Sequence, residues 1–438
     1  MALGNGVVAT SSGTLPSTGA APAFWGWRVV AGCFLALVVT AGIGFYNLTI
    51  YLQAFVEARG FSVSAVSAAT GAFFLAAGLS GVLVARFIER HDVRLALVAG
   101  AVLGAITLSA SSLVQTVGQL YIFYVLLGIA YTTAGLVPCT TVLARWFVKK
   151  RTIALATAFT GLSLGGIVMT PPCVWLISHL GIGGAGPWLG GVFLVGIVVP
   201  AIFLVRSRPE DHGQVPDGIV DGDGVQAAAA EISVPFATAV RSRFFICLSI
   251  GYVLVMTAQV GGISHLYRLV AGRLDAPTAA LAVAILAGTS IAGRLLAGLL
   301  LPRMRMRPAT MAIVAVQSVG LLLLAFAMGH GPLLGFAALF GSTIGNIGML
   351  QPLLVAEAFG VRSYARIYAM SQLMTTFGAA AGPTLFGYLY DHTGGYELSY
   401  GLAAGLSAAC CLLILLAGPT DGTRARFAET LPDTPAAY

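Results

Sequence analysis

Long apolar runs recur along the chain and are separated by short polar turns. Each run has about 20 residues or more, the length that an α-helix needs to cross roughly 30 Å of hydrocarbon. The composition agrees, because 58% of the 438 residues are hydrophobic and only 9% are charged, against about 25% charged residues in a soluble domain. We therefore predict an all-α membrane protein.

The apolar runs predict twelve transmembrane helices in two groups of six. The predicted spans are 27–53, 63–87, 94–115, 119–145, 152–180, 187–206, 243–268, 277–301, 309–329, 333–358, 366–390 and 397–417. One long polar stretch, 207–242, separates an N-terminal half (27–206) from a C-terminal half (243–417), and we interpret it as a cytoplasmic linker. Residues 1–26 are interpreted as a disordered cytoplasmic tail rather than a signal peptide, and 418–438 as a second cytoplasmic tail.

Basic residues gather in every second connection, which sets the expected orientation. The expected inner connections hold most of the arginines, whereas the outer ones hold only Arg59, Arg268 and Arg273. This asymmetry predicts that both termini lie in the cytoplasm. It also accounts for the net charge of +7 without a nucleic-acid partner.

The two halves echo each other in sequence. Each has a Gly-rich second helix that runs into a basic inner turn, "GLSGVLVARFIERHDVR" (78–94) and "GRLLAGLLLPRMRMR" (293–307). Two such halves joined by a linker are typical of transporters that hold a substrate near the membrane midplane between them. Arg86 and Arg303, in the matching basic turns, are the predicted gating residues.

Four stretches resemble the monocarboxylate and oxalate/formate branches of the major facilitator superfamily. They are "FWGWRVVAG" (24–32), "ARWFVKKRTIALATAFTGLSLGG" (144–166), "RSRPEDHGQVPDG" (206–218) and "GRLLAGLL" (293–300). The resemblance implies the major facilitator fold and a bacterial inner-membrane carrier of a small monocarboxylate such as lactate or pyruvate. It further implies alternating access, a proton as co-substrate, a monomer, and no cofactor or metal. It also implies that Arg294, in the last stretch, binds the substrate carboxylate.

Three positions depart from these relatives. Ala85 precedes Arg86 where the superfamily usually has aspartate, so the charge network that closes the inner gate must differ. Ser290 stands four residues before Arg294, where animal monocarboxylate transporters have an aspartate. The resemblance therefore does not identify the residue that carries the proton. Ser371 occupies the place of the oxalate-type lysine, which argues against a dicarboxylate.

Arg294 lies about eight residues from the inner end of its predicted helix, or roughly 12 Å, close to the midplane. None of the sixteen acidic residues lies mid-span, and a guanidinium keeps its charge in proteins. A substrate carboxylate would supply the missing charge and suits bidentate binding by the guanidinium. The alternative is that Arg294 reaches the cytoplasmic surface or donates hydrogen bonds to the carbonyls of a neighbouring helix.

Other polar residues near mid-span complete the predicted site. Asn47, near the position of the lysine of the animal transporters, is the strongest of these candidates for substrate contact, and each of them could instead tie helices together. The remaining candidates are Tyr46, Tyr131, Gln259, Asn346 and Tyr368. Histidine as a residue type ordinarily titrates near neutral pH, so His265, inside a predicted span of the C-terminal half, is the candidate proton relay, or else a hydrogen-bonded anchor.

Competing classes fit the sequence less well. Gly161-Leu-Ser163-Leu-Gly165 has the G-x-S-x-G form of a hydrolase elbow, but it falls inside a predicted helix without an acid partner. We therefore predict no enzyme and expect these small residues to allow close helix packing. A drug exporter of the same fold is the main alternative, although exporters of cations need an intramembrane carboxylate. A non-transporting sensor would call for an attached soluble domain. Because the chain has no ATP-binding motif, a gradient would drive transport.

Overall fold

The computed structural model describes residues 24–61, 63–218, 233–420 and 427, and the elements it assigns in them are helices. Ten segments of the described chain are long and apolar enough to cross a membrane. One of them, α7 (Arg151–Phe203), has 53 residues, about 80 Å of helix, and reverses direction at Gly181, whose φ is 68° and ψ 170°. It therefore supplies two crossings.

The N-terminal half is built from seven α-helices and two short helical turns. They are α1 (Gly26–Ala41), η1 (Gly42–Tyr46), α2 (Leu48–Arg59), α3 (Val63–Arg90), α4 (Val93–Ser109), η2 (Ala110–Leu113), α5 (Val117–Thr133), α6 (Leu136–Trp146) and α7. The first span is continuous through α1, η1 and α2, and the fourth through α5 and α6. Six crossings therefore make up this half, as the sequence predicts.

The C-terminal half has six long helices and follows a short helix, α9 (Phe236–Arg241). The six are α10 (Arg243–Arg273), α11 (Ala276–Leu300), α12 (Met306–Phe326), α13 (His330–Phe359), α14 (Tyr364–Thr393) and α15 (Glu397–Ala417), with η5 (Leu301–Arg303) after α11. α14 is not among these ten segments. Its 30 residues, about 45 Å of helix, nevertheless run the length of the half beside α10.

Helices pair in the same way in both halves. The first crossing packs on the fifth (α1 with α7, α10 with α14), and the second on the fourth (α3 with α5, α11 with α13). The third packs on the sixth (α4 with the end of α7, α12 with α15). The sequence echo between the two halves is therefore matched by a repeated packing arrangement.

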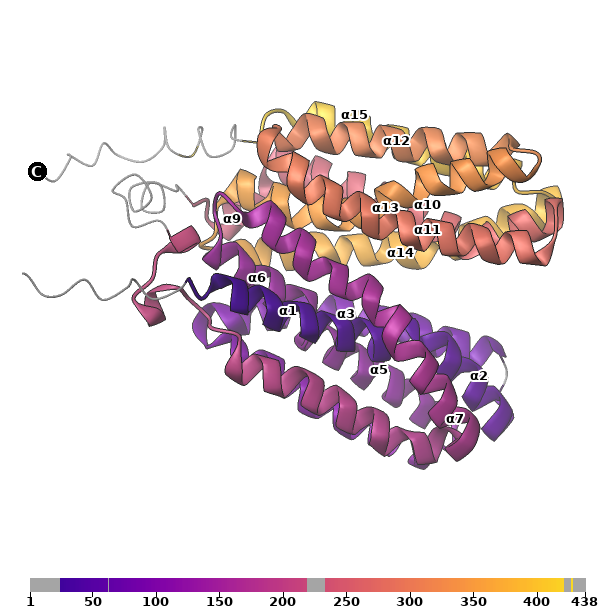
Figure 1. The fold of residues 1–438 in the computed structure, drawn as a ribbon, viewed down its shortest axis with the longest axis horizontal. Helices are drawn as coiled ribbons and strands as arrows, with labels where there is room; N and C mark the ends of the chain where they lie inside the picture. The colour runs from indigo at the N-terminus through magenta and orange to yellow at the C-terminus, as the bar shows by residue number, and fades with distance from the viewer. Residues whose placement is uncertain (1–23, 62, 219–232, 421–426, 428–438) are drawn as a thin grey trace, which may run out of the picture.

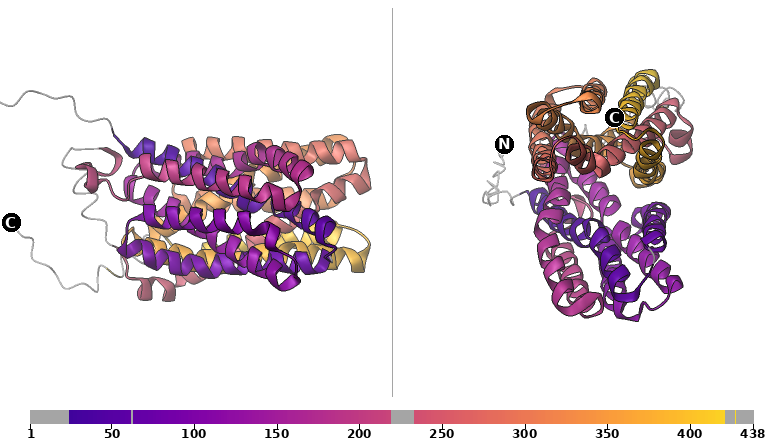
Figure 2. Two further views of the ribbon diagram at one scale, coloured as in Figure 1. Left: turned by 90° about the horizontal axis from the view of Figure 1, so that it is seen from below. Right: turned by 90° about the vertical axis from the view of Figure 1, so that its right-hand side faces the viewer.

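The two bundles meet along α3 with α14 and along α7 with α11. Their axes converge at the end that carries α9 and residues 204–218, and diverge toward the opposite end (Figures 1 and 2). We call the first of these the linker end and the second the far end. The first span breaks from α-helix into the π-helical η1 about halfway along its length, at the level where the two halves face each other.

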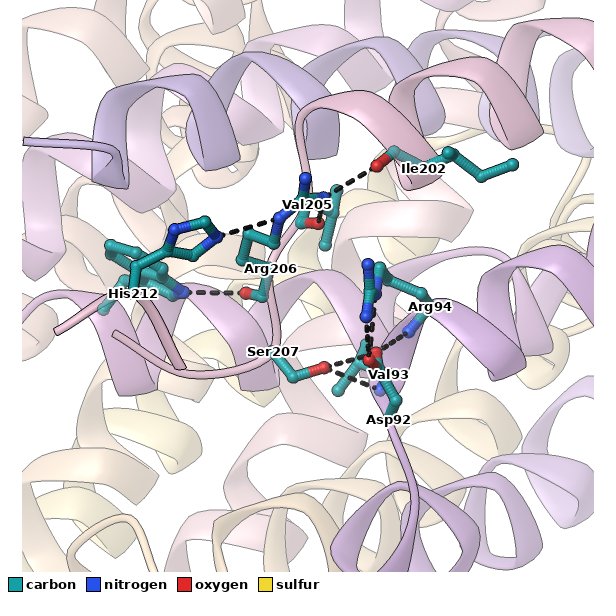
Figure 3. Close-up of polar contacts among 9 residues, drawn as sticks. Asp92, Val93, Arg94, Ile202, Val205, Arg206, Ser207 and His212 are labelled. Atoms are coloured by element: carbon teal, nitrogen blue, oxygen red, sulfur yellow. Dashed lines mark hydrogen bonds and ion pairs between the residues drawn. The ribbon is translucent and has the colours of Figure 1, made fainter. Parts of the chain in front are cut away.

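The part of the linker next to α7 is folded against the N-terminal half. Ser207 donates a hydrogen bond to Asp92 (2.5 Å) and accepts one from the Val93 amide (3.0 Å), while Arg206 donates to His212 (2.9 Å) (Figure 3). This segment includes two short turns, η3 (Glu210–His212) and η4 (Pro216–Gly218). Within the predicted linker, 207–242, the segments 207–218 and 233–241 contain short helices. Residues 219–232 of the linker and 1–23 of the predicted N-terminal tail lie outside the described residues.

Asp217 fixes η4 to the turn that precedes α7. Its carboxylate accepts hydrogen bonds from the backbone amides of Val148 (3.0 Å), Lys149 (2.6 Å) and Lys150 (3.1 Å). Asp217 is buried with a φ of 62°, a left-handed conformation that Asp adopts more readily than most residues. The aspartate thus satisfies amides at the start of a helix, where the helix dipole favours a negative charge.

Candidate functional site

Arg294, on α11, lies at the contact between the two halves. Its side chain is 6% exposed. Nε donates a hydrogen bond to the Gly345 carbonyl of α13 (3.0 Å), and one terminal nitrogen donates to the Phe159 carbonyl and the Ser163 hydroxyl (3.3 Å) of α7. The guanidinium therefore joins the C-terminal half to the N-terminal half, and it does not reach the surface.

Small residues allow this approach. A Cβ at Gly345 would lie 2.5 Å from the Ser290 carbonyl oxygen and 2.8 Å from Arg294 Nε, and one at Gly298 would lie 2.7 Å from Cβ of Ala156 on α7. All three distances are too short for real atoms, so the close contact of α11 with α13 requires glycine at 345 and its contact with α7 requires glycine at 298. On α7, Gly161 and Gly165 lie close to the backbone of α1, which is the packing role that the sequence predicts for the G-x-S-x-G stretch.

The partners of Arg294 solvate its charge without neutralising it. Carbonyl and hydroxyl oxygens are neutral acceptors, and Arg294 takes part in none of the ion pairs within the described residues. Its second terminal nitrogen makes no hydrogen bond with any described residue. The site thus contains a buried positive charge with donor capacity left for an anion.

Three predicted amide side chains are buried and only partly hydrogen-bonded. Asn47 accepts a hydrogen bond from Thr170 (3.1 Å), and Asn346 donates one to the Ser342 carbonyl (2.8 Å). Nδ2 of Asn47, Oε1 of Gln259 and Oδ1 of Asn346 have no partner in the described part of the protein. Because buried polar atoms are nearly always satisfied, these three atoms are positions where a ligand would find a donor and two acceptors. Asn346 follows Gly345, whose carbonyl accepts the hydrogen bond from Arg294.

Tyr46 and Tyr131 lie on the N-terminal side of the interface. Tyr46, in η1, is 43% exposed, and its ring lies against Gly166 of α7, three residues after Ser163, which accepts a hydrogen bond from Arg294. Tyr131, on α5, lines a cavity of about 230 Å³ between the halves. Tyr368 is 1% exposed, stacks on Tyr364 with the ring centroids 5.8 Å apart, and is not among the described residues that line this cavity.

His265 lies away from Arg294, within the C-terminal half. Its Nε2 is 3.1 Å from the Pro383 carbonyl of α14, and its Nδ1 is 3.0 Å from the Tyr396 hydroxyl at the start of α15. Because a carbonyl can only accept, Nε2 carries the proton and Nδ1 accepts from the tyrosine when the ring is neutral. Both nitrogens are thus engaged in contacts between helices.

The two predicted gating arginines lie at the linker end, and both are exposed. Arg303 donates to the Leu299 carbonyl of its own helix (2.9 Å), and Arg86 lines a surface hollow with Arg90, His91 and Arg366. The ion pair that joins the halves here is a different one, between Glu89 of α3 and Nε of Arg366 of α14 (2.5 Å). It lies in a cleft of about 650 Å³ that both halves line.

Two residues of this arrangement are missing from the sequence prediction, and each had a signal. Glu89 lies four residues after Ala85, one helical turn further along the same face of α3, so the acid is shifted rather than lost. Ser163 lies four residues after Phe159, which puts both on one face of α7. Its motif was assigned to packing alone, yet its hydroxyl also contacts Arg294.

Two six-helix bundles with a cavity between them are typical of secondary transporters. The sequence matches the Major Facilitator Superfamily over residues 32–359, and the chain belongs to this family. The predicted fold is confirmed, and the chain is a multi-pass membrane transporter, not an enzyme.

Several known proteins are similar over most of their length. Monocarboxylate transporter 13 of Bos taurus is 23% identical over 395 residues, which cover 90% of this chain and 89% of the relative. Monocarboxylate transporter 7 of Homo sapiens is 24% identical, with 89% of this chain and 86% of the relative covered. Among solved structures, the major facilitator transporter FucP in its outward conformation superposes with a TM-score of 0.67 at 14% identity, covering 89% of this chain and 98% of FucP.

Proposed function

We propose that this transporter carries a small monocarboxylate across the cell inner membrane by alternating access, together with a proton. One observation carries the proposal: Arg294 is a buried guanidinium between the halves, and within the described residues its partners are neutral oxygens. An anion with one negative charge would neutralise it. The similarity to monocarboxylate transporters supports the same class of substrate.

The contacts of Arg294 suggest how binding acts on the halves. A carboxylate at the guanidinium competes with the Phe159 carbonyl and the Ser163 hydroxyl, and both of these belong to the opposite half. Binding therefore weakens a contact between α7 and α11 while it neutralises the buried charge. A ligand that changes the interactions between the halves in this way shifts the equilibrium between their arrangements.

The distribution of arginines supports a cytoplasmic linker end, with the linker and both termini on that side. With this orientation the described conformation faces outward, because the halves are joined at the linker end by Glu89 and Arg366. Arg86 and Arg303 remain candidates for gating, His265 for proton transfer, and Asn47, Gln259 and Asn346 for substrate contact. The arrangement fits a monomer, since both halves of the site come from one chain.

The alternative, an exporter of drugs on the same fold, requires a way to bind cations. In the described residues the acids closest to the interior are Glu89 and Glu357. Glu89 is paired with Arg366, and Glu357 accepts a hydrogen bond from Thr420 near the end of α13 (2.6 Å). Neither lies near Arg294, so the site favours anions.

Uptake by purified protein in proteoliposomes tests the proposal. We expect labelled pyruvate or lactate to accumulate under an imposed pH gradient, and a lipophilic cation not to. Arg294→Lys keeps the charge but loses the planar fork, so we expect the half-saturation concentration to rise roughly 10- to 150-fold, which corresponds to one charged hydrogen bond. Arg305→Lys, at an exposed helix end, is the matched control. Wild-type affinity in Arg294→Lys would refute binding by the fork.

A further inference from the structure

The cavity between the halves has aromatic and apolar walls. Phe45 of η1, Phe74 of α3 and Tyr131 of α5 line it from the N-terminal half, and Met256 and Val260 of α10 from the C-terminal half. Polar side chains enter from α14 and from the end of α5; they are Gln372, Thr375, Thr376 and Thr132. The cavity therefore offers an apolar site for the hydrophobic part of a ligand, with polar side chains along one edge.

The three rings are arranged around Phe45. Its centroid lies 6.0 Å from that of Phe74 in an edge-to-face contact (78°), and 6.2 Å from that of Tyr131 in a stacked one (27°). Both geometries are favourable for aromatic pairs. Phe45 nevertheless remains 38% exposed, so a large apolar surface is uncovered near the middle of the membrane, on the side that faces the cavity.

The aromatic cavity adjoins the charged site through two consecutive residues. Phe45 lines the cavity, while the ring of Tyr46 lies against Gly166 of α7, about one helical turn from Ser163, which accepts a hydrogen bond from Arg294. The two ring centroids are 5.2 Å apart. A molecule that spans this distance with an acid at one end would place its other end against Phe45.

We propose that the preferred substrate is an aryl-substituted monocarboxylate, with its carboxylate on Arg294 and its ring in the cavity lined by Phe45, Phe74 and Tyr131. This inference rests on the proposed function and specifies the group that the substrate carries besides its carboxylate. The volume is sufficient, because a cavity of about 150 Å³ in another protein holds a benzene molecule and this one has about 230 Å³. Lactate or pyruvate would bring a single methyl group and leave most of the apolar wall uncovered.

Phenylpyruvate and pyruvate form a matched pair for the test, because they share the keto-acid group and differ by the phenyl ring. We expect the half-saturation concentration of phenylpyruvate for uptake into proteoliposomes to be at least about tenfold lower than that of pyruvate, since burial of the ring adds to binding. Arg294→Lys should weaken both acids by the same factor.

Variants that fill the cavity locate the ring. Ala77 of α3 and Ala379 of α14 line the cavity from opposite halves, and each is replaced by leucine in a separate protein. We expect each change to raise the half-saturation concentration of phenylpyruvate about tenfold and that of pyruvate less than about twofold. Ala408→Leu, at an exposed position on α15, is the control. Two cavity variants are made so that the test still stands if one of them does not fold.

The outcomes separate the two proposals. Equal half-saturation concentrations for the two acids in the wild type would overturn the proposed preference for aryl acids. The proposal that the protein carries monocarboxylates would still stand. A preference for phenylpyruvate that both leucine variants retain would place the ring elsewhere and overturn the assignment of the cavity. If folded protein takes up neither acid, both proposals fail.

Discussion

Among single residues, His265 can be tested directly as either a proton relay or a hydrogen-bonded anchor between helices. Both of its ring nitrogens already contact α14 and α15 within one half, so we expect His265→Ala to lower the free energy of unfolding by about 1–2 kcal/mol. Uptake per folded molecule should keep its dependence on the pH gradient. Tyr396→Phe, which removes the partner of Nδ1, should act in the same direction. Loss of the pH-gradient dependence with intact substrate exchange would assign the relay to His265 instead.

Asp92 should make stability depend on pH. Burial raises the pKa of its carboxyl, but hydrogen bonds from Arg94 and Ser207 outweigh burial and lower the pKa to about 2. Because the usual value is about 3.9, the stabilisation is fully present above about pH 4 and is lost as the pH falls toward 2.

The test replaces this aspartate with an uncharged residue. We expect Asp92→Asn to cost about 1 kcal/mol near neutral pH, discounted because the side chain is 30% exposed, and thermal unfolding to show the difference shrinking below about pH 4. Asp211→Asn, an exposed acid nearby without a hydrogen bond to any described residue, is the control. A difference that stays constant from pH 6 to pH 2 would contradict the charge argument.

Arg294 shows which properties of a single residue can be predicted from the sequence. Its burial and the absence of a mid-span acid were predictable, because both depend on residue type and position along a helix. Two of its three partners are the backbone carbonyls of Gly345 and Phe159, and because every residue has a carbonyl, these two partners cannot be identified from the sequence. Of the two alternatives to substrate binding, the structure shows the carbonyl contacts and not the exposed surface position.

At the scale of elements, the contact of α1 with α7 depends on a glycine. A Cβ at Gly165 would overlap the Val38 carbonyl and lie 2.9 Å from the Gly42 amide nitrogen, and both are backbone atoms that cannot move alone. We expect Gly165→Ala to destabilise the protein by about 1–3 kcal/mol. Gly191→Ala, on the same helix with open space around it, should be neutral or slightly stabilising. Thermal unfolding of the two variants measures the contrast, and equal melting temperatures would count against the packing argument.

Helix positions followed from hydrophobic runs, but breaks within helices did not. The six predicted spans of each half all appear, because each crossing needs about 20 apolar residues. The π-helical η1 and the interruption at Gly135, with φ −117° and ψ −127°, have no comparable signal, since glycines are frequent throughout this chain. These breaks decide which way Phe45, Tyr46 and Tyr131 point, so the aromatic cavity could not be predicted.

At the scale of the whole molecule, the repeated helix pairing gives each half its own packed bundle. The main contacts between the halves are those of α3 with α14 and of α7 with α11; α7 with α13 and α6 with α14 make smaller ones, and the ion pair of Glu89 with Arg366 adds to them. Interfaces of this sort permit rigid-body rearrangement, because the packing inside each half need not change. Opening of the linker end must break this ion pair, whatever the substrate is.

Glu89→Gln should therefore favour the arrangement that is open at the linker end. The paired side chains are 16% and 31% exposed, so the ion pair contributes about 1 kcal/mol and its loss should raise the open-to-closed ratio about fivefold. The modification rate of a cysteine introduced at Ser363, which lines the same cleft, reports the opening. Glu210→Gln, in that cleft but without an ion pair among the described residues, should leave the rate unchanged. The double variant Glu89→Arg with Arg366→Glu should restore closure, because the attraction depends on the two charges and not on which helix carries each. A modification rate that stays high in this double variant would show that Glu89 acts through another partner.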